Sequence, residues 1–303
     1  MKKIKCWIEA MRLRTLPVSV AGVIMAGGCA VATRTFSALP LCLCLIFAIL
    51  AQIASNFANE YYDFKGGLDR KGREGPRRGV TEGDITPRAM LCATYLTLGI
   101  ACCVGLSLLA FSGWWLLPVG ILVALGVVAY STGPYPLSHH GLGEVAVIAF
   151  FGIVPVCCTY VLQGGEWTWQ IFLAGLAMGL MGANVLIVNN YRDADDDRAV
   201  GKHTLAVIFG RRKMVWLYRI NALAAVLLMT HWLAITPWLP TAAIGIIYIA
   251  GALWVSRQLT RRNGRALTPL LGITAMLMLF FALAWFAVSF LTVPQTEPWI
   301  VGG

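Results

Sequence analysis

The sequence predicts an all-α membrane protein with nine transmembrane helices in a bundle around a central cavity, its N-terminus in the cytoplasm and its C-terminus outside. Composition is the first reason: 58% of the 303 residues are apolar, 13% are charged and the mean hydropathy is +0.73. Soluble domains carry about 25% charged residues. The second reason is a series of apolar windows of membrane-spanning length. The third is an alternation of basic and non-basic connecting segments.

The apolar windows define the nine spans. Each is close to the length of about 20 residues that a helix needs to cross the hydrocarbon layer. Very short turns separate spans three and four, and spans seven and eight. The predicted spans are 16–33, 39–58, 88–111, 113–130, 144–163, 168–188, 214–236, 238–256 and 267–292.

Lysine and arginine residues indicate the cytoplasmic side. Five precede span one, seven lie between spans two and three, seven around the loop after span six, and four between spans eight and nine. Of the 24 basic residues, only Arg34 falls outside these alternate segments. Because basic loops stay in the cytoplasm, the N-terminus is predicted inside and an odd number of spans places the C-terminus outside. Residues 1–303 are interpreted as one integral membrane domain.

Charge and cysteine content exclude some partners. The net charge of +10 is explained by this topology and by anionic lipid, so we expect no nucleic-acid partner. The nine cysteines lie almost entirely within apolar spans and lack the spacing of metal ligands or of a disulfide framework. Their predicted role is packing.

A short motif is repeated at the cytoplasmic ends of spans two and six. "NEYYD" starts at Asn59 and "NNYRD" at Asn189, so the pattern N-x-Y-x-D recurs after 130 positions. Each motif leads into a basic, glycine-containing loop, and the two motif-bearing segments are 59–88 and 189–213. Repeat-built membrane proteins commonly bind substrate between their halves. We therefore expect the two helix ends to face one another across a cavity.

The spacing within each motif predicts a magnesium site. The asparagine and the aspartate are four residues apart in both motifs, so each pair shares one helical face. A second carboxylate follows each pair. Carboxylate and carboxamide oxygens suit Mg²⁺, which substrate phosphates usually complete. The predicted metal ligands are Asn59, Asp63, Asp69, Asn189, Asp193 and Asp197, and the four aspartates Asp63, Asp69, Asp193 and Asp197 are the predicted catalytic residues.

Basic residues next to these carboxylates predict a phosphate-binding site, because lysine and arginine neutralise phosphate oxygens. A competing interpretation is that the carboxylates merely balance arginines in solvated loops. The matched spacing at two equivalent helix ends favours a functional site. The predicted diphosphate-binding residues are Arg70, Lys71, Arg73, Arg77, Arg78, Arg198 and Lys202.

At these residues the chain resembles the UbiA superfamily of intramembrane aromatic prenyltransferases, whose members carry two aspartate-rich motifs on the second and sixth of nine helices. The resemblance covers about two thirds of the chain, to the end of the second motif loop. It weakens in the last three spans. The matching segments are "MRLRTLP" (11–17), "NEYYDFKGGLD" (59–69), "REGPRRG" (73–79), "GLGE" (141–144), "FFG" (150–152) and "NNYRDADDDRAVGKHTLA" (189–206).

The resemblance implies transfer of a polyprenyl group from polyprenyl diphosphate to an aromatic acceptor, with Mg²⁺ as cofactor. Asp63 and Asp69 are six residues apart, where the branch that prenylates hydroxybenzoate usually has four. This spacing favours the branch that acts on 1,4-dihydroxy-2-naphthoate, releases CO2 and diphosphate, and forms demethylmenaquinone. The implied location is the bacterial cytoplasmic (inner) membrane, with the isoprenoid tail in an apolar groove open to lipid and the active site facing the cytoplasm.

Several nearby residues have less specific roles. Glu60 stands where the family more often has aspartate, so its metal role is in doubt, and Asp195 and Asp196 are interpreted as solvated charges outside the family register. Aromatic faces can stabilise an allylic carbocation, although core packing or interfacial anchoring is the favoured role for each tyrosine taken alone. The aromatic candidates are Tyr61, Tyr62, Tyr130 and Tyr191.

The segment "YSTGPYPLSHHGLGE" (130–144) is rich in glycine and proline, which predicts a shaped loop that serves as a lid or as a wall for the acceptor. His139, His140 and His203 are weaker acid or base candidates, and His231 is expected to pack or anchor at the outer side.

Two alternatives stay open. Within the enzyme class, the acceptor could be 4-hydroxybenzoate, homogentisate or haem. From a different class, an ion-coupled transporter could use a repeated carboxylate pair to bind cations. Against the transporter, both motifs lie at one membrane face and basic residues back them.

Overall fold

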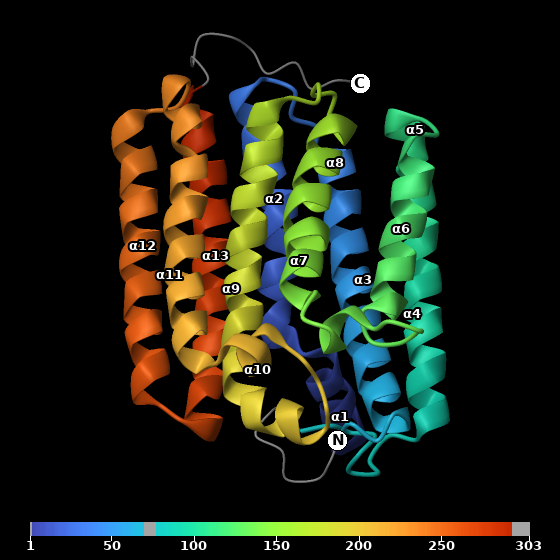
Figure 1. Ribbon diagram of the computed structural model, residues 1–303. Coiled ribbons are helices and arrows are strands. Elements are labelled where there is room, and N and C mark those ends of the chain that lie inside the picture. Colours follow the sequence, from blue (N-terminus) through green and yellow to red (C-terminus); the bar gives the residue numbers. More distant parts are fainter. Residues whose placement is uncertain (1, 70–76, 293–303) are drawn as a thin grey trace.

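The structure of the protein is a computed structural model that describes residues 2–69 and 77–292, and this part of the chain is helical throughout, without a β-strand. The long helices run side by side in one bundle (Figure 1). Its elements are α1 (Lys2–Met11), η1 (Leu13–Thr15), α2 (Leu16–Ala32), α3 (Ala38–Lys65), α4 (Pro87–Ser107), α5 (Leu109–Ser112), α6 (Leu116–Ala129), η2 (Leu137–His139), α7 (Gly143–Val147), η3 (Ile148–Ile153), α8 (Val154–Leu162), α9 (Trp169–Ala199), α10 (Leu205–Phe209), α11 (Arg211–Leu228), η4 (Thr230–Ala234), α12 (Trp238–Arg261), η5 (Gly264–Leu267), α13 (Thr268–Ser289) and η6 (Phe290–Thr292).

Eight helical stretches in the described residues are long and apolar enough to cross a membrane, which confirms the predicted all-helical membrane fold. They correspond to eight of the nine predicted spans. The remaining one, predicted over 113–130, is the shorter helix α6, with 14 residues. At 1.5 Å per residue it is about 21 Å long. It begins late because Gly113, with φ of +81°, separates it from α5.

The two motif-bearing ends lie at the same end of the bundle. α1, α10 and the C-terminal ends of α3 and α9 are found there, whereas α13 finishes at the opposite end (Figure 1). This arrangement agrees with an odd number of crossings between α1 and the end of α13. That the motif end faces the cytoplasm stays a prediction from the basic residues.

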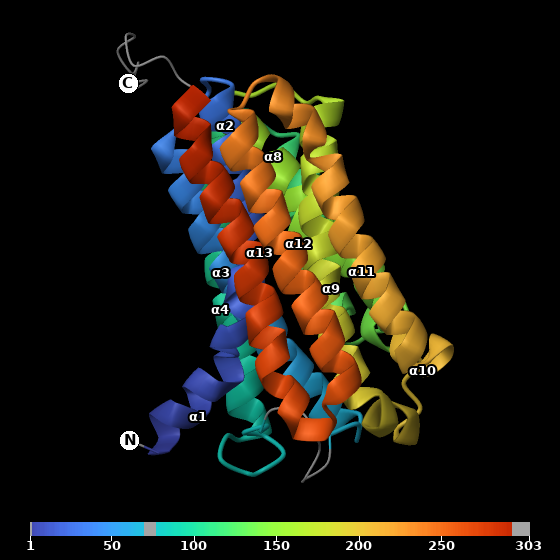
Figure 2. The same cartoon turned by 90° about the vertical axis from the view of Figure 1, so that its left-hand side faces the viewer.

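Helices α2 and α9 form the centre of the bundle. Most of the apolar part of each is buried inside the protein, while α11, α12 and α13 pack on one side and α3, α4 and α6 stand on the other (Figures 1 and 2). The segment η3 is a π-helix that packs directly on α9. A Cβ added at Gly152 would lie 2.3 Å from the Cα of Gly179, so glycine is required for this approach.

Candidate active site

The two repeated motifs end helices that meet at one polar cavity. Asn59 and Asp63 lie near the C-terminal end of α3, and Asn189 and Asp193 lie in the last third of α9. All four side chains line a cavity of about 190 Å³. The structure thus brings together two segments that are 130 positions apart (59 and 189) in the chain.

The later aspartates of the two motifs behave differently. α9 continues to Ala199, so Asp197 stays on the helical face of Asp193 and also lines the cavity. Asp69 follows the end of α3. Its carboxylate Oδ2 lies 3.3 Å from Nε of Arg78, which lines the cavity, and its side chain is buried.

Asp63 is the point where several segments converge. Its carboxylate is almost fully buried, with Nζ of Lys202 3.3 Å and Nη2 of Arg78 3.6 Å from Oδ2. Nε2 of His139 lies 3.7 Å from Oδ1. Within the described residues, Oδ1 has no hydrogen-bond partner. A buried carboxylate oxygen normally has a partner, so this atom is suited to a cation or a ligand.

Arg78 links the first motif to its loop. Its Nη2 donates to the carboxamide oxygen of Asn59 at 2.9 Å and its Nε pairs with Asp69. The side chain is buried, and among the described residues its Nη1 has no hydrogen-bond partner. A buried guanidinium with an unused donor on a polar cavity can bind an anion such as phosphate.

Asp193 is held within its own helix. Arg192 donates to both of its carboxylate oxygens, at 2.6 and 2.9 Å, and also to the carboxamide oxygen of Asn189 at 2.9 Å. Both members of the ion pair are about 2% exposed. This bidentate geometry fixes the carboxylate of Asp193 on the cavity wall.

The charges around the cavity are balanced. Four carboxylates and four basic residues line it, so a strongly negative ligand together with a divalent cation would leave the balance nearly unchanged. The carboxylates are Asp63, Glu144, Asp193 and Asp197, and the basic residues are Arg12, Arg78, Arg192 and Lys202.

The predicted phosphate-binding cations divide into three groups. Arg78 and Lys202 line the cavity. Arg77 instead pairs with Asp84 and lies 3.7 Å from Glu9. Arg198 is exposed and pairs with Asp195. Arg70, Lys71 and Arg73 fall outside the described residues.

Two cavity arginines were not predicted from the sequence. Arg12 reaches in from the segment before α2, and its Nη2 donates to Oδ1 of Asn59 at 2.7 Å. Arg192 belongs to the second motif itself. In the sequence both arginines indicate only the cytoplasmic side of the membrane. Arg12 also lies in the segment "MRLRTLP", which resembles the family and could have indicated a role in the site.

Of the four candidate tyrosines, Tyr130 is the one that lines the cavity. Tyr61 packs with Phe57 and neighbouring apolar residues near α1. The hydroxyl of Tyr62 lies 2.8 Å from that of Tyr95. The guanidinium carbon of Arg211 lies over the ring of Tyr191, 5.6 Å from the ring centroid. The structure therefore gives Tyr61, Tyr62 and Tyr191 packing positions.

The acidic residues in doubt also have clear positions. Glu60 is buried and its Oε1 accepts the backbone N–H of Val80 at 3.0 Å, so its carboxylate anchors the turn after the first motif. The side chain of Asp195 is 70% exposed, as expected for a solvated charge. Asp196 is partly exposed. The cavity lining includes none of these three described residues.

The loop between α6 and α7 forms one wall, as its glycine and proline content predicts. Ser138, Gly141 and Gly143 line the cavity. The carbonyl of His139 accepts the backbone N–H of His203 at 2.8 Å, which attaches this wall to the second motif loop. His140 stacks on Tyr135 instead, at a centroid distance of 3.8 Å.

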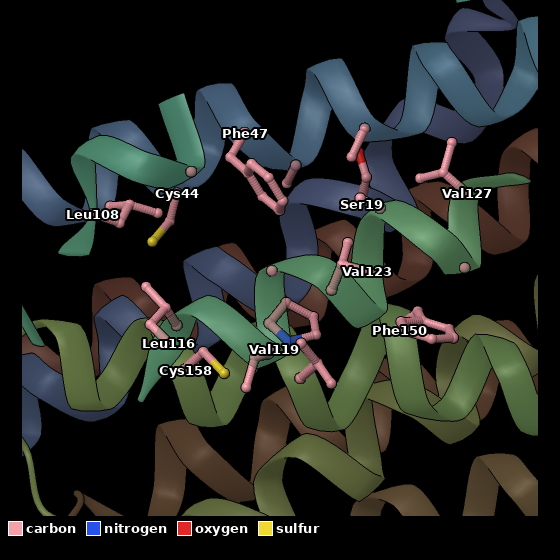
Figure 3. Close-up of a pocket in the computed structure, with 18 of the residues that line it drawn as sticks. Ser19, Cys44, Phe47, Leu108, Leu116, Val119, Val123, Val127, Phe150 and Cys158 are labelled. Carbon is pink, nitrogen blue, oxygen red and sulfur yellow. The ribbon is translucent and has the colours of Figure 1, made fainter. Parts of the chain in front are cut away.

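A second, apolar cavity adjoins the polar one. It has a volume of about 310 Å³ and lies between α3, α4, α6, η3 and α8. Phe47 and Phe150 reach into it from opposite walls, and Cys44 and Cys158 lie towards its far end (Figure 3). The residues that line both cavities are Gln52, Ser55, Tyr130, Val147 and Phe151.

The polar cavity has donor atoms of the kind that a magnesium ion prefers. The polar cavity offers oxygen donors from two facing helices, and Oδ1 of Asp63 is buried without a hydrogen-bond partner among the described residues. Within the same part of the chain, no three acidic, histidine or cysteine side chains stand close enough for a ready-made metal cage. Mg²⁺ usually binds through one or two carboxylates plus substrate phosphates. The residues therefore fit a magnesium site that substrate completes.

The family model for the UbiA prenyltransferase family matches residues 20–269, which include both motifs and most of the bundle. The chain belongs to the UbiA prenyltransferase family. This membership confirms the resemblance found in the sequence and makes the protein a prenyltransferase of a membrane-embedded type.

Curated UbiA relatives cover most of the chain. One from Mycobacterium tuberculosis, named 1,4-dihydroxy-2-naphthoate octaprenyltransferase, is 35% identical over 92% of this chain and 94% of its own length. A protein of the same name from Haemophilus influenzae is 36% identical over 70% of this chain and 71% of its own length.

Solved structures of UbiA homologues share the fold. One from Archaeoglobus fulgidus, bound to GPP and Mg²⁺, superposes with a TM-score of 0.63 at 17% identity and covers 92% of this chain and all of its own. Another structure of a UbiA homologue from the same organism gives a TM-score of 0.66 at 16% identity, over 93% of this chain and 98% of its own. At this identity the likeness supports the architecture alone.

Proposed function

We propose that the protein transfers a polyprenyl group from polyprenyl diphosphate to 1,4-dihydroxy-2-naphthoate, with release of CO2 and diphosphate, and forms demethylmenaquinone. The observation that carries the proposal is the contact between a polar cavity, built by two repeated asparagine and aspartate motifs, and an apolar cavity. A prenyl diphosphate has the same division into a charged head and an apolar tail. The names of the curated relatives support the acceptor.

The polar cavity would hold the diphosphate. Arg78 has a buried donor without a hydrogen-bond partner among the described residues, and the ammonium group of Lys202 lines the same cavity. Both would bind phosphate oxygens. Asp63 and Asp193, with Asn59 and Asn189, would hold Mg²⁺ between the two helices. When bound, Mg²⁺ supplies positive charge that stabilises the departing diphosphate. The four cavity cations would contribute to the same stabilisation.

The apolar cavity would hold the first isoprene units of the tail. Its walls are aliphatic and aromatic side chains from α3, α6 and α8. With the head in one cavity and the tail in the other, the allylic carbon lies at their junction. Tyr130 lines both cavities, so its ring can stabilise positive charge that develops on that carbon. Water has to be excluded there, because it would capture the cation as an alcohol.

The acceptor would approach the junction from the polar side, along the wall made by residues 138–144. The ring carbon then attacks the allylic carbon, and the adduct loses CO2. In a bacterial cell we place the protein in the cytoplasmic membrane, as the basic loops predict. The motif end, the diphosphate head and the soluble aromatic acceptor would then lie on the cytoplasmic side, with the prenyl tail in the membrane.

An acceptor panel tests this proposal. Membranes that contain the protein are given one labelled prenyl diphosphate and, separately, dihydroxynaphthoate, 4-hydroxybenzoate and homogentisate. We expect a prenylated, decarboxylated product from dihydroxynaphthoate alone. Product from hydroxybenzoate without product from dihydroxynaphthoate would overturn the choice of acceptor. Membranes from cells that lack the protein provide the background.

Removal of the metal separates this enzyme from an ion-coupled transporter. Excess chelator should stop consumption of the prenyl diphosphate, and added Mg²⁺ should restore it. Equal turnover with and without chelator would contradict the proposed role of the two aspartate motifs. Membership of a prenyltransferase family gives no support to the transporter alternative.

A further inference from the structure

One buried carboxylate of the polar cavity has no role in the site described above. Glu144 lies in the first turn of α7 and is only 5% exposed, yet it lines the cavity. It belongs to neither aspartate motif. Acidic side chains are almost never buried to this extent unless they are paired or bind a ligand.

The hydrogen bonds of Glu144 are incomplete. Its Oε1 accepts from Nδ2 of Asn190 at 3.0 Å. Its Oε2 is buried and has no hydrogen-bond partner among the residues that the structure describes. A carboxylate that served only to join α7 to α9 would need Oε1 alone. The second oxygen therefore indicates a ligand that donates a hydrogen bond.

Glu144 lies close to the junction of the two cavities. Glu144 is three residues before Val147, which lines both cavities. The preceding residue is Gly143, where an added Cβ would lie 3.5 Å from the hydroxyl of Tyr130. One π-helical segment further on, Gly152 packs backbone to backbone against α9. Glu144 thus stands on the cavity wall, beside the junction where the allylic carbon would lie.

We infer that Oε2 of Glu144 accepts a hydrogen bond from a hydroxyl group of the aromatic acceptor and takes its proton when the ring attacks. The inference rests on the proposed function, and it adds an acceptor-binding and catalytic residue on a different helix from the metal motifs. An electron-rich hydroxyarene needs a hydrogen-bond acceptor close to the junction. Of the carboxylates on the cavity, Asp63 and Asp193 already carry basic partners.

The bonds and protons balance. A bond forms between the allylic carbon and the ring carbon that bears the carboxylate, next to the hydroxyl, and the C–O bond to diphosphate breaks with its electron pair on diphosphate. The hydroxyl proton moves to Glu144, and the O–H pair becomes the carbonyl of the adduct. Loss of CO2 leaves an enolate, which takes the proton back from Glu144 and restores the hydroxyl.

The substitution Glu144→Gln tests the proton transfer. Glutamine has the same shape, and its amide oxygen can still accept from Asn190. We expect kcat to fall by about 100-fold or more, the usual contribution of a general base, while KM for the prenyl diphosphate and the magnesium requirement stay unchanged. The matched control is Glu166→Gln, an exposed glutamate between α8 and α9 at the opposite end of the bundle. It should keep wild-type kinetics.

A series of acceptors distinguishes a base from a purely structural residue. Ring substituents can make the acceptor hydroxyl more acidic, so that it needs less help to lose its proton. The deficit of Glu144→Gln should shrink steadily along this series, whereas a packing defect would lower every rate by the same factor. A constant deficit, or wild-type kcat in the variant, would overturn the inference.

The inference can also be tested on the wild-type protein, without the Glu144→Gln variant. Methyl ethers of the acceptor, made at either hydroxyl, cannot donate to Glu144 from the blocked position. At least one ether should give no product, and equal turnover of both ethers and the parent would overturn the inference even if Glu144→Gln failed to fold. Absence of product from the parent acceptor itself would instead contradict the proposed function.

Discussion

The two aspartate motifs match in sequence but differ in how their charges are neutralised. Asp63 on α3 is contacted by Lys202, 139 residues further along the chain, and by Arg78, from the loop that follows α3. Asp193 on α9 is contacted by Arg192, the residue next to it. One half of the site therefore depends on loops that must come together, while the other half has a bidentate ion pair within one helix.

This difference assigns different tasks to the two halves. In the second motif the bidentate pair of Arg192 and Asp193 forms without any other segment. The first motif connects the loops, since the segments around Arg78, His139 and Lys202 all approach the same carboxylate. Substrate that binds at Asp63 would therefore affect the arrangement of these loops more than substrate at Asp193.

The largest expected effect is a loss of turnover, and it should be the same for both motifs because both are proposed to bind the metal. Asp63→Asn and Asp193→Asn each remove one negative charge with almost no change of shape, so each should lower turnover by roughly 1,000-fold, as loss of a major electrostatic contribution does. Turnover of labelled prenyl diphosphate in membranes measures this. Wild-type turnover in either variant would remove that residue from the metal site.

The next expected effect is on protein stability, which should differ between substitutions at the two motifs. Arg192→Met leaves the buried carboxylate of Asp193 without its bidentate partner, and loss of one member of a buried pair costs about 3–5 kcal/mol. Lys202→Met should lower the free energy of unfolding by less, about 1–2 kcal/mol. Asp63 then still has Arg78 and His139 nearby. Thermal and denaturant unfolding in detergent compare the two. Equal losses would show that the two carboxylates are held in the same way.

A smaller effect concerns substrate binding at the first motif. Lys202→Met should raise KM for the prenyl diphosphate by about tenfold, since one charge-assisted contact is lost. Arg198→Met is the matched control, because Arg198 lies in the last turn of α9, four residues before Lys202, but is exposed and pairs with Asp195. An equal rise in KM for both variants would indicate a diffuse electrostatic effect in place of a specific contact.

Hydropathy, basic residues and the repeated motif were enough to predict the helical membrane fold and the meeting of the two helix ends. They could not decide which of two adjacent arginines enters the cavity. Arg77 and Arg78 lie in a segment without helical periodicity. Arg77 pairs with Asp84 outside the cavity, whereas Arg78 lines the cavity. Arg192 was missed for another reason. It lies one residue from the predicted ligand face, and its long side chain reaches back to that face.

Tertiary contacts also explain why Glu60 and Glu144 were not assigned roles. In the sequence, Glu60 looks like a lengthened metal ligand, yet its carboxylate accepts a backbone N–H of the following turn. Glu144 appears as one acid in a polar loop. Its burial and its unpaired Oε2, within the described residues, depend on how α7 packs against α9. Neither contact follows from local spacing.

The smallest expected effect tests the register of the second motif. Asp195→Asn and Asp196→Asn each remove a charge within three residues of Asp193, but neither side chain lines the cavity. Asp195 is exposed, 3.0 Å from Arg211 and 3.5 Å from Arg198, and exposed pairs contribute about 0–1 kcal/mol. Turnover in membranes should stay within about twofold of wild type, because surface changes alter free energies by only about 0.5 kcal/mol. A loss as large as that of Asp193→Asn would mean that α9 turns a different face to the substrate. The contrast between neighbours with the same side chain therefore tests the helix orientation itself, since charge and chain position are nearly the same and only the direction of the carboxylate differs.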